Sequence, residues 1–252
     1  MKKEKTGRKE LWKNEKLGKR YLEIVRAAIP LAKIQTEVLL VLIRKMRGKV
    51  ANFLDLGCGD GNLGWAILEE HPDAKSVFLD FSGSMIQAAR ARAPRNNPDL
   101  FFVQEDYGKP SWPLAVAGYD KFDLIVSGFS IHHQPDQKKK KIYRKIYDLL
   151  VPGGLFLNLE HVQSASREIQ KIFSEYFIDS LFGRLRRLDP SCTRKKVSKE
   201  YYHNQLLDTN ILAPVEKQCQ WLRNIGFCQV DCFFKIFELS LFGGLKPRRS
   251  RL

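Results

Sequence analysis

The sequence predicts an α/β domain with one seven-stranded, mostly parallel sheet whose last strand is antiparallel. An apolar run ends in Asp55 and breaks into glycines at alternate positions before a helical pattern starts at Leu63. This order is typical of a buried strand, a tight turn and a helix N-terminus, the start of a βαβ unit. Strand-like runs then alternate with helical patterns as far as Glu160, which predicts parallel strands joined by helices. Two adjacent strand-like runs after residue 228 predict the antiparallel edge.

Helical patterns precede the first strand. Residues 1–18 are rich in Lys, and we expect a basic, flexible lead-in there. Apolar residues recur at helical spacing over Tyr21–Ile29 until Pro30 interrupts them. A second helix is expected over Lys33–Met46, with Gly48 as its stop.

The central part of the chain continues the alternation of helices and strands. The strand-like runs are short and apolar, whereas the helical segments carry apolar residues three and four apart. We expect, in order, helix Leu63–Glu70, strand Lys75–Asp80, helix Ser84–Arg92, strand Leu100–Glu105, strand Lys121–Ser127, helix Asp136–Leu150 and strand Leu155–Glu160.

The helix over Asp136–Leu150 is strongly basic, with Lys or Arg at most positions from 138 to 145. Its apolar residues, among them Ile142 and Ile146, form one inward stripe, so we expect most of the basic residues on the solvent face. The following Val151-Pro152-Gly153-Gly154 predicts a turn that stops the helix before the fifth strand.

After the fifth strand the pattern becomes less regular. We expect a helix over Arg167–Phe182 and then a basic, poorly patterned segment over Gly183–Lys199. A helix over Val215–Asn224 leads to the closing antiparallel pair, Gln229–Phe234 with Phe237–Phe242.

We expect these elements to form a single domain over residues 19–247. Its parts are an N-terminal helical cap at about 19–48, the strands and helices of the sheet, and an insert at about 161–213. A basic tail follows at 248–252.

Composition places the chain among soluble proteins of a reducing compartment. Hydrophobic residues make up 44% of it, and the longest aliphatic run, Val38–Ile43, is far too short to cross a bilayer. The basic N-terminus lacks an apolar signal core, so we expect cytoplasmic residence. The five cysteines form no Cys-x-x-Cys pair and no further ligands accompany them, so we expect free thiols and no bound metal. Cys228 and Cys232, four apart in a strand, are expected on one face.

The glycine turn fits two cofactors. Gly59-Asp60-Gly61-Asn62-Leu63-Gly64 satisfies the dinucleotide fingerprint, and Asp80 lies at the right distance to bind a ribose, so an NAD-dependent oxidoreductase is one alternative. The longer string Asp55-Leu56-Gly57-Cys58-Gly59-Asp60-Gly61 resembles the nucleotide-binding motif of class I S-adenosylmethionine (SAM) methyltransferases. The strand that ends in Asp80, the segment Phe81–Ile86 and the Pro-Gly-Gly turn resemble the same family.

This resemblance implies a Rossmann-like class I methyltransferase fold, with N-terminal helices and a helical insert after the fifth strand, and SAM as the cofactor. In that family the glycine turn lies along the methionine and ribose of SAM, and acids end the second and third strands beside the ribose and adenine. The N-terminal helices either roof the SAM pocket or simply cover one sheet face. The residues that match the cofactor positions are Asp55, Gly57, Cys58, Gly59, Asp80, Phe81, Met85, Asp106, Tyr107 and Ser127.

Candidate catalytic residues gather where such a fold places its substrate. Methyl transfer from a sulfonium is an in-line displacement, and it needs a general base only if the acceptor loses a proton. His161 is the first candidate, because an imidazole accepts protons near neutral pH. The full set is His132 and His133 after the fourth strand, Glu160 and His161 after the fifth, and Tyr201, Tyr202 and His203 in the insert, which in this fold commonly supplies a substrate lid.

The charge distribution favours a small-molecule acceptor, acidic or aromatic, over a nucleic acid. The net charge is +15, but residues 1–20 hold nine Lys or Arg against three Glu, and residues 245–252 hold four Lys or Arg and no acid. Charged termini are usually solvated and do not line a pocket. A tRNA-directed enzyme and a non-catalytic SAM-binding partner protein remain alternatives, and the oligomeric state is not predicted.

The layout also resembles the enzyme that makes carboxy-SAM for tRNA wobble-uridine modification. That enzyme uses an arginine in the insert to hold the extra carboxylate. Here Tyr202 or His203 occupies the matching position, so ordinary SAM is the expected cofactor.

Overall fold

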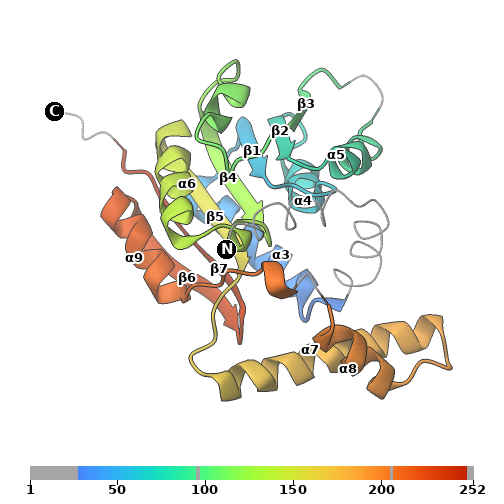
Figure 1. The fold of residues 1–252 in the computed structure, drawn as a ribbon. Helices are drawn as coiled ribbons and strands as arrows, with labels where there is room; N and C mark the ends of the chain where they lie inside the picture. Colours follow the sequence, from blue (N-terminus) through green and yellow to red (C-terminus); the bar gives the residue numbers. More distant parts are fainter. Residues whose placement is uncertain (1–27, 95–96, 205–206, 249–252) are drawn as a thin grey trace. The chain divides into compact units, whose positions relative to one another are not determined.

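The sheet has seven strands in the order β3-β2-β1-β4-β5-β7-β6 within the segments that the computed structural model describes, residues 28–94, 97–204 and 207–248 (Figure 1). The strands β3, β2, β1, β4 and β5 pair with one another in parallel, and β7 is antiparallel to both β5 and β6. The predicted fold class is therefore confirmed. The strands are β1 (Asn52–Leu56), β2 (Lys75–Asp80), β3 (Leu100–Gln104), β4 (Phe122–Gly128), β5 (Leu150–His161), β6 (Cys228–Ile236) and β7 (Leu239–Leu245).

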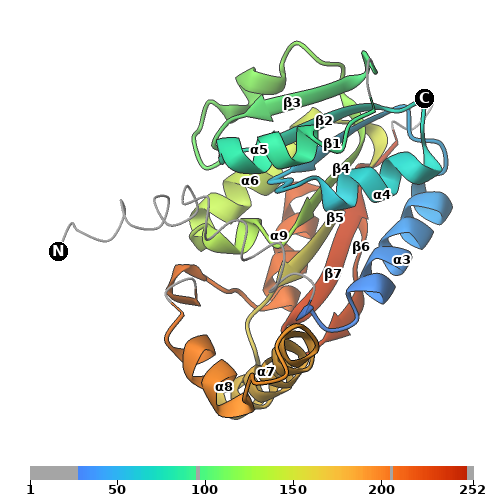
Figure 2. The same ribbon diagram turned by 90° about the vertical axis from the view of Figure 1, so that its right-hand side faces the viewer.

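Helices cover both faces of the sheet (Figures 1 and 2). Successive residues of a strand point to opposite faces, so Phe53 and Leu54 of β1 belong to different buried clusters. Because both faces are buried, the central strands are apolar almost throughout. The cluster with Phe53 is covered by α3 (Ala32–Leu42), α4 (Asn62–Glu70) and α5 (Gly83–Arg90), and the cluster with Leu54 by α6 (Asp136–Leu149) and α9 (Val215–Ile225).

The described residues divide into two compact units. The larger unit contains the sheet and comprises residues 35–163 and those from 211 onward, whereas the smaller comprises residues 28–34 and 164–210. In the smaller unit, α7 (Arg167–Leu188) and α8 (Arg194–Tyr202) pack around a small apolar cluster that contains Ile178, Leu181 and Val197. The side chains of Ser166 and Thr193 cap the two helices by accepting hydrogen bonds from the amides of Ile169 and Lys196.

The end of α7 and all of α8 correct the sequence prediction. The predicted helix stopped at Phe182 and left a poorly patterned segment, but α7 continues to Leu188 and α8 follows. Leu185 and Val197 pack with the same cluster as Leu181, and the basic residues between them hide this spacing in the sequence.

The start of β5 is a second correction. Val151-Pro152-Gly153-Gly154 lies inside the strand, which begins at Leu150 instead of Leu155. The amide of Gly153 donates to the carbonyl of Lys246, and the amide of Lys246 donates to the carbonyl of Gly154, each at 2.8 Å. A partner distant in sequence thus makes a strand from residues that are typical of a turn.

The predicted shared face of Cys228 and Cys232 is also wrong. Cys228 pairs with Leu245 and Cys232 with Phe242, an odd separation on β7, because the register shifts between them. Gln229, at φ +50°, lies in this irregular stretch. Cys228 is exposed, whereas Cys232 packs against the cluster with Leu54.

The N-terminal predictions are only partly covered by the structure. The lead-in over residues 1–18, most of the helix predicted over Tyr21–Ile29 and the tail from residue 249 lie outside the described residues. The stop at Gly48 is confirmed: α3 widens into a π-helical turn over Ile43–Arg47, and the Gly48 amide donates to the Ile43 carbonyl at 2.9 Å. Within the described segments, no helix is long and apolar enough to span a membrane.

Candidate active site

The turn after β1 needs glycine for two different reasons. Gly57 and Gly59 adopt φ values of +70° and +56°, in the left-handed region that favours glycine. Gly57 is also in close contact with the loop after β4, because a Cβ there would lie 2.0 Å from the Ser130 hydroxyl oxygen. The alternate glycines of the sequence therefore follow from backbone geometry and close approach together.

Asp80 holds this turn from the end of β2. Its Oδ2 accepts a hydrogen bond from the Gly59 amide at 3.0 Å, and its Oδ1 accepts one from the Ser82 amide at 2.9 Å. Burial raises the pKa of Asp80, and hydrogen bonds from the Ser82 and Gly59 amides oppose that rise. The residue predicted to bind a ribose thus also fixes the backbone on which a cofactor would lie.

Asp55 connects β1 to α4. Its buried Oδ2 accepts a hydrogen bond from the Gly64 amide at 2.9 Å. Loss of hydration raises the pKa of Asp55 to about 7, although the Gly64 bond acts in the opposite direction. Burial also raises the pKa of the neighbouring Cys58 thiol, so this cysteine remains protonated.

Other residues that match cofactor positions follow β2 and β3, and Tyr107 among them lies close to Gly57. The Asp106 carboxylate accepts a hydrogen bond from the Gly108 amide at 2.9 Å, and the Tyr107 hydroxyl lies 2.7 Å from Ser130 Oγ. Phe81 is half-buried just after β2, and Met85 is buried in the first turns of α5.

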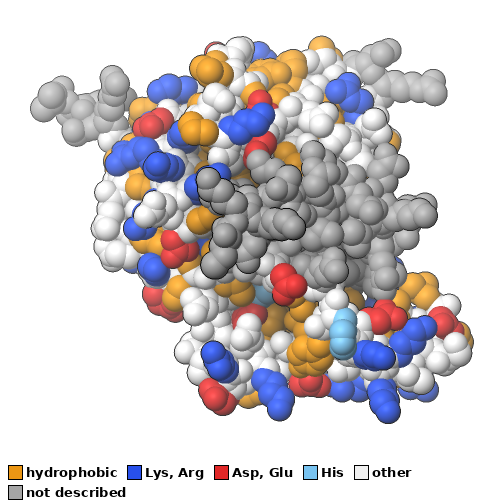
Figure 3. All heavy atoms as spheres, viewed as in Figure 1, with side chains coloured by type: hydrophobic (Ala, Val, Ile, Leu, Met, Phe, Trp, Pro, Cys, Tyr) orange, Lys and Arg blue, Asp and Glu red, His pale blue; other side chains and the backbone are white. Residues whose placement is uncertain are grey.

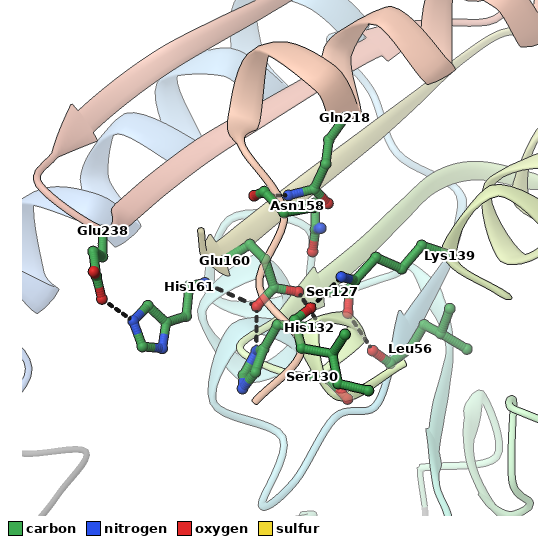
Figure 4. Close-up of polar contacts among 12 residues, drawn as sticks. Leu56, Ser127, Ser130, His132, Lys139, Asn158, Glu160, His161, Gln218 and Glu238 are labelled. Carbon is green, nitrogen blue, oxygen red and sulfur yellow. Dashed lines mark hydrogen bonds and ion pairs between the residues drawn. The ribbon is translucent and has the colours of Figure 1, made fainter. Parts of the chain in front are cut away.

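Ser127 is fully buried, and its hydroxyl donates to the Leu56 carbonyl at 2.8 Å (Figure 4). This bond joins the ends of β1 and β4. Ser130 was not among the predicted site residues. Its position in the loop after β4, where open α/β sheets bind ligands, was the available signal.

A second group of polar side chains lies at the end of β5 and in the loop after β4, centred on Glu160 (Figure 4). Glu160 Oε1 lies 2.5 Å from His132 Nδ1 and accepts a bond from the His161 amide at 2.9 Å, while Oε2 accepts one from the His132 amide at 3.0 Å. Burial raises the pKa of Glu160 to about 7, opposed by the His161 amide and by the charges of His133 and Lys139. Three sequence candidates, His132, Glu160 and His161, are therefore brought together.

Glu238 extends this group from the turn between β6 and β7. Its Oε2 lies 2.6 Å from His161 Nε2, and its side chain is buried. The rings of His132 and His133 have centroids 3.9 Å apart, and those of His132 and His161 lie 5.7 Å apart. Glu238 was not predicted, although it is an acid inside an apolar hairpin sequence.

Lys139 is an exception to the prediction that the lysines of α6 face solvent. Its side chain is buried, and Nζ donates to the Ile211 carbonyl and to Asp136 Oδ1 at 3.2 Å. Desolvation lowers the pKa of Lys139, while the charges of Asp136 and Glu160 raise it. The ammonium therefore attaches the returning segment at Ile211 to α6, beside Glu160.

The candidates from the insert belong to the smaller unit. Tyr202 is exposed and donates its hydroxyl proton to Glu175 Oε1 at 2.8 Å. His203 is exposed as well, with Nδ1 lying 2.7 Å from the Lys199 carbonyl. Tyr201 packs against the small apolar cluster. The structure thus associates these side chains with α7 and α8, and groups the other candidates in the larger unit.

Comparison with known proteins identifies the domain that carries the glycine turn. Residues 54–156, which include the glycine turn, Asp80 and the histidines after β4, match the methyltransferase domain family. The chain carries a class I SAM-dependent methyltransferase domain. Among the described residues of this methyltransferase, no cluster of three His, Cys, Asp or Glu side chains is arranged to hold a metal ion.

Three relatives show how far the likeness of this methyltransferase extends. A carboxy-S-adenosyl-L-methionine synthase from a Nitratiruptor species is 23% identical over 94% of this chain and 93% of that protein. A trans-aconitate 2-methyltransferase from Methylobacterium radiotolerans is 35% identical over 40% of this chain and 35% of that protein. The structure of human N-acetylserotonin methyltransferase with SAM matches with a TM-score of 0.60 at 15% identity, covering 94% of this chain. This chain spans 58% of that structure, and because the identity is only 15% this likeness shows the fold alone.

Proposed function

We propose that this methyltransferase transfers the SAM methyl group to a small-molecule acceptor by in-line displacement. The observation that carries the proposal is the link between the two polar groups at the carboxyl edge of the sheet. Ser130 contacts Gly57 of the glycine turn, bonds Tyr107, and precedes His132 in the same loop. Ligands of open α/β sheets bind beyond this edge, so cofactor and acceptor would lie side by side there.

The cofactor side of the proposal rests on the glycine turn and its acids. A carboxylate has about four acceptor positions, so Asp80 can hold the Gly59 and Ser82 amides and still accept bonds from ribose hydroxyls. Asp106 would accept a bond from the adenine amino group. Gly57 and Gly59 would lie along the methionine and ribose.

The remaining matched residues would act mainly through shape. Cys58, Phe81, Met85 and Tyr107 would form the walls of the cofactor site. Asp55 and Ser127 would act through the backbone groups that they bond, the Gly64 amide and the Leu56 carbonyl. The contribution of the protein to catalysis would then be alignment of the acceptor with the S–CH₃ bond and exclusion of water.

The charges of the described residues support a small molecule over RNA. Arg194, in the basic part of the insert, is paired with Glu175 at 2.7 Å and with Asp179 at 2.6 Å. On the face that Figure 3 shows, Lys and Arg side chains are interspersed with Asp and Glu instead of forming one continuous patch. A surface that tracks a phosphate backbone needs uncompensated cations. The trans-aconitate methyltransferase among the relatives is named for a small acidic acceptor.

Carboxy-SAM formation is the second candidate. The observation in its favour is that a carboxy-SAM synthase is similar along 94% of this chain, well beyond the methyltransferase domain itself. An arginine fork is the natural partner of a carboxylate. Tyr202 and His203, at the matching place in the insert, supply no such fork, which favours ordinary methyl transfer.

The test is transfer of label from S-[methyl-³H]adenosylmethionine to a panel of hydroxylated aromatic compounds, amines and carboxylic acids. We expect label in at least one small acceptor, and loss of that transfer in Asp80→Ala. Asp73→Ala, which changes an exposed acid just before β2, is the matched control. Transfer by the wild type to none of the panel, together with methylated RNA from a tRNA pool, would contradict the proposal.

A further inference from the structure

The pairing of the His161 ring with Glu238 adjoins the network in which Glu160 holds the loop after β4. Glu160 makes its bonds to the amides of His132 and His161 and to the His132 ring, so it fastens backbone to backbone. Glu238 reaches the ring of the other histidine, with Oε2 2.6 Å from His161 Nε2. Glu238 lies in the hairpin turn between β6 and β7. The backbone at Glu238 is held in place, because the Val162 amide donates to the Glu238 carbonyl at 2.7 Å.

The two pairs differ in how accessible the imidazole is. The His161 side chain keeps 18% of its surface exposed, whereas those of His132, Glu160 and Glu238 keep 8%, 1% and 3%. A small molecule at the carboxyl edge of β5 therefore has better access to His161 than to the other three. The buried carboxylate behind it is in the arrangement that orients a catalytic histidine.

We propose that Glu238 is the positioning residue of a His161 general base, and that the acceptor is therefore an O–H or N–H group that loses its proton on methylation. This inference rests on the proposed methyl transfer. A lone pair of the acceptor oxygen or nitrogen forms the new bond to the methyl carbon. The C–S bond breaks with its electrons going to sulfur, leaving neutral S-adenosylhomocysteine. The acceptor proton passes to His161 Nδ1, and Glu238 stabilises the imidazolium through Nε2–H.

The inference selects among acceptor classes. A carboxylate is already ionised at neutral pH and needs no base to accept a methyl group. A phenol, an alcohol or an amine must lose a proton, and a positioned base contributes roughly 10²–10⁴-fold to such a step. A His161 base held by Glu238 therefore points to an acceptor that carries a proton.

The first experiment is independent of turnover. At pH 8, long-range ¹H–¹⁵N spectra, with His161 assigned by comparison with His161→Asn, should show the ring proton on Nε2. Its ¹H resonance should lie far downfield, as expected for a short bond to a carboxylate. Glu238→Gln should move this resonance upfield, and Glu216→Gln, at an exposed position on α9, should leave it unchanged. A ring proton on Nδ1 in the wild type, or a resonance that Glu238→Gln leaves unchanged, would overturn the proposed role of Glu238.

The second experiment uses the acceptor found in the labelled panel. Glu238→Gln should lower kcat on an O–H or N–H acceptor roughly 100-fold or more, with the SAM Kd and acceptor KM within about twofold of wild type. Glu238→Asp should recover part of the loss, and the control Glu216→Gln should keep the wild-type rate. If kcat is unaffected by Glu238→Gln, or the preferred acceptor is a carboxylate, the base role is wrong. Absence of any methylated acceptor would instead refute the proposed function, while the spectra still decide the role of Glu238.

Discussion

Replacing Asp80 with Asn tests whether one carboxylate both holds the glycine turn and binds SAM. The carboxylate accepts two amide hydrogen bonds, from Gly59 and Ser82, and its residue is only 6% exposed. The Asn side chain has one acceptor oxygen, so one amide loses its partner. A hydrogen bond to a charged group contributes about 1.5–3 kcal/mol, and we expect the free energy of unfolding to fall by that amount.

The loss of SAM binding free energy in Asp80→Asn should be of similar size. Loss of the charged acceptor for the ribose, with a less ordered turn, should weaken SAM binding about ten- to a hundredfold. Urea denaturation measures the first quantity and calorimetric titration of the folded variant measures the second. Asp73→Asn, an exposed acid near the start of β2, is the control. A variant with wild-type stability and wild-type SAM affinity would show that Asp80 has neither role.

Three further predictions concern pH, the glycine turn and the cofactor. Asp55 and Glu160 have pKa values raised by burial to about 7, so between about pH 4 and 7 the folded state binds more protons than the unfolded state. The free energy of unfolding should therefore fall as pH rises through that window. Asp55→Asn keeps an acceptor for the Gly64 amide but does not titrate, so the free energy of unfolding of this variant should depend less on pH. Urea denaturation at several pH values measures both. Gly57→Ala places a Cβ 2.0 Å from Ser130 Oγ at φ +70°, so it should lower the melting temperature and abolish SAM binding; unchanged melting would refute the close approach. The protein should bind SAM at least as tightly as carboxy-SAM in calorimetry, and a clear preference for carboxy-SAM, or its copurification, would favour the second candidate function.

The parts of the site that depend on local sequence could be predicted. Gly57, Gly59 and Asp80 interact across one βαβ unit, where the turn and the next strand end impose their own spacing. Turn chemistry and apolar periodicity were enough to predict the glycine turn and the strand end on which they lie. The mostly parallel sheet with an antiparallel last strand followed as well, because strands that alternate with helices pair in parallel.

The parts that depend on distant pairing could not be predicted. Glu238 reaches His161 across 77 residues only because β7 pairs with β5 in the register that places Leu239 opposite His161. Lys139 looked like one more solvent-facing lysine, but the returning segment at Ile211 supplies its carbonyl partner. Neither the register of an antiparallel edge nor the return point of an insert is encoded in local propensity.

Competition between acceptors in one reaction tests the proposed function. The protein is incubated with S-[methyl-³H]adenosylmethionine, a mixture of small hydroxylated, amino and carboxylic compounds, and a tRNA pool, and the label is then separated by size. We predict that label accumulates in the small-molecule fraction, that it disappears with Asp80→Ala, and that RNA remains unlabelled. Label in the tRNA with none in the small-molecule fraction would contradict the account.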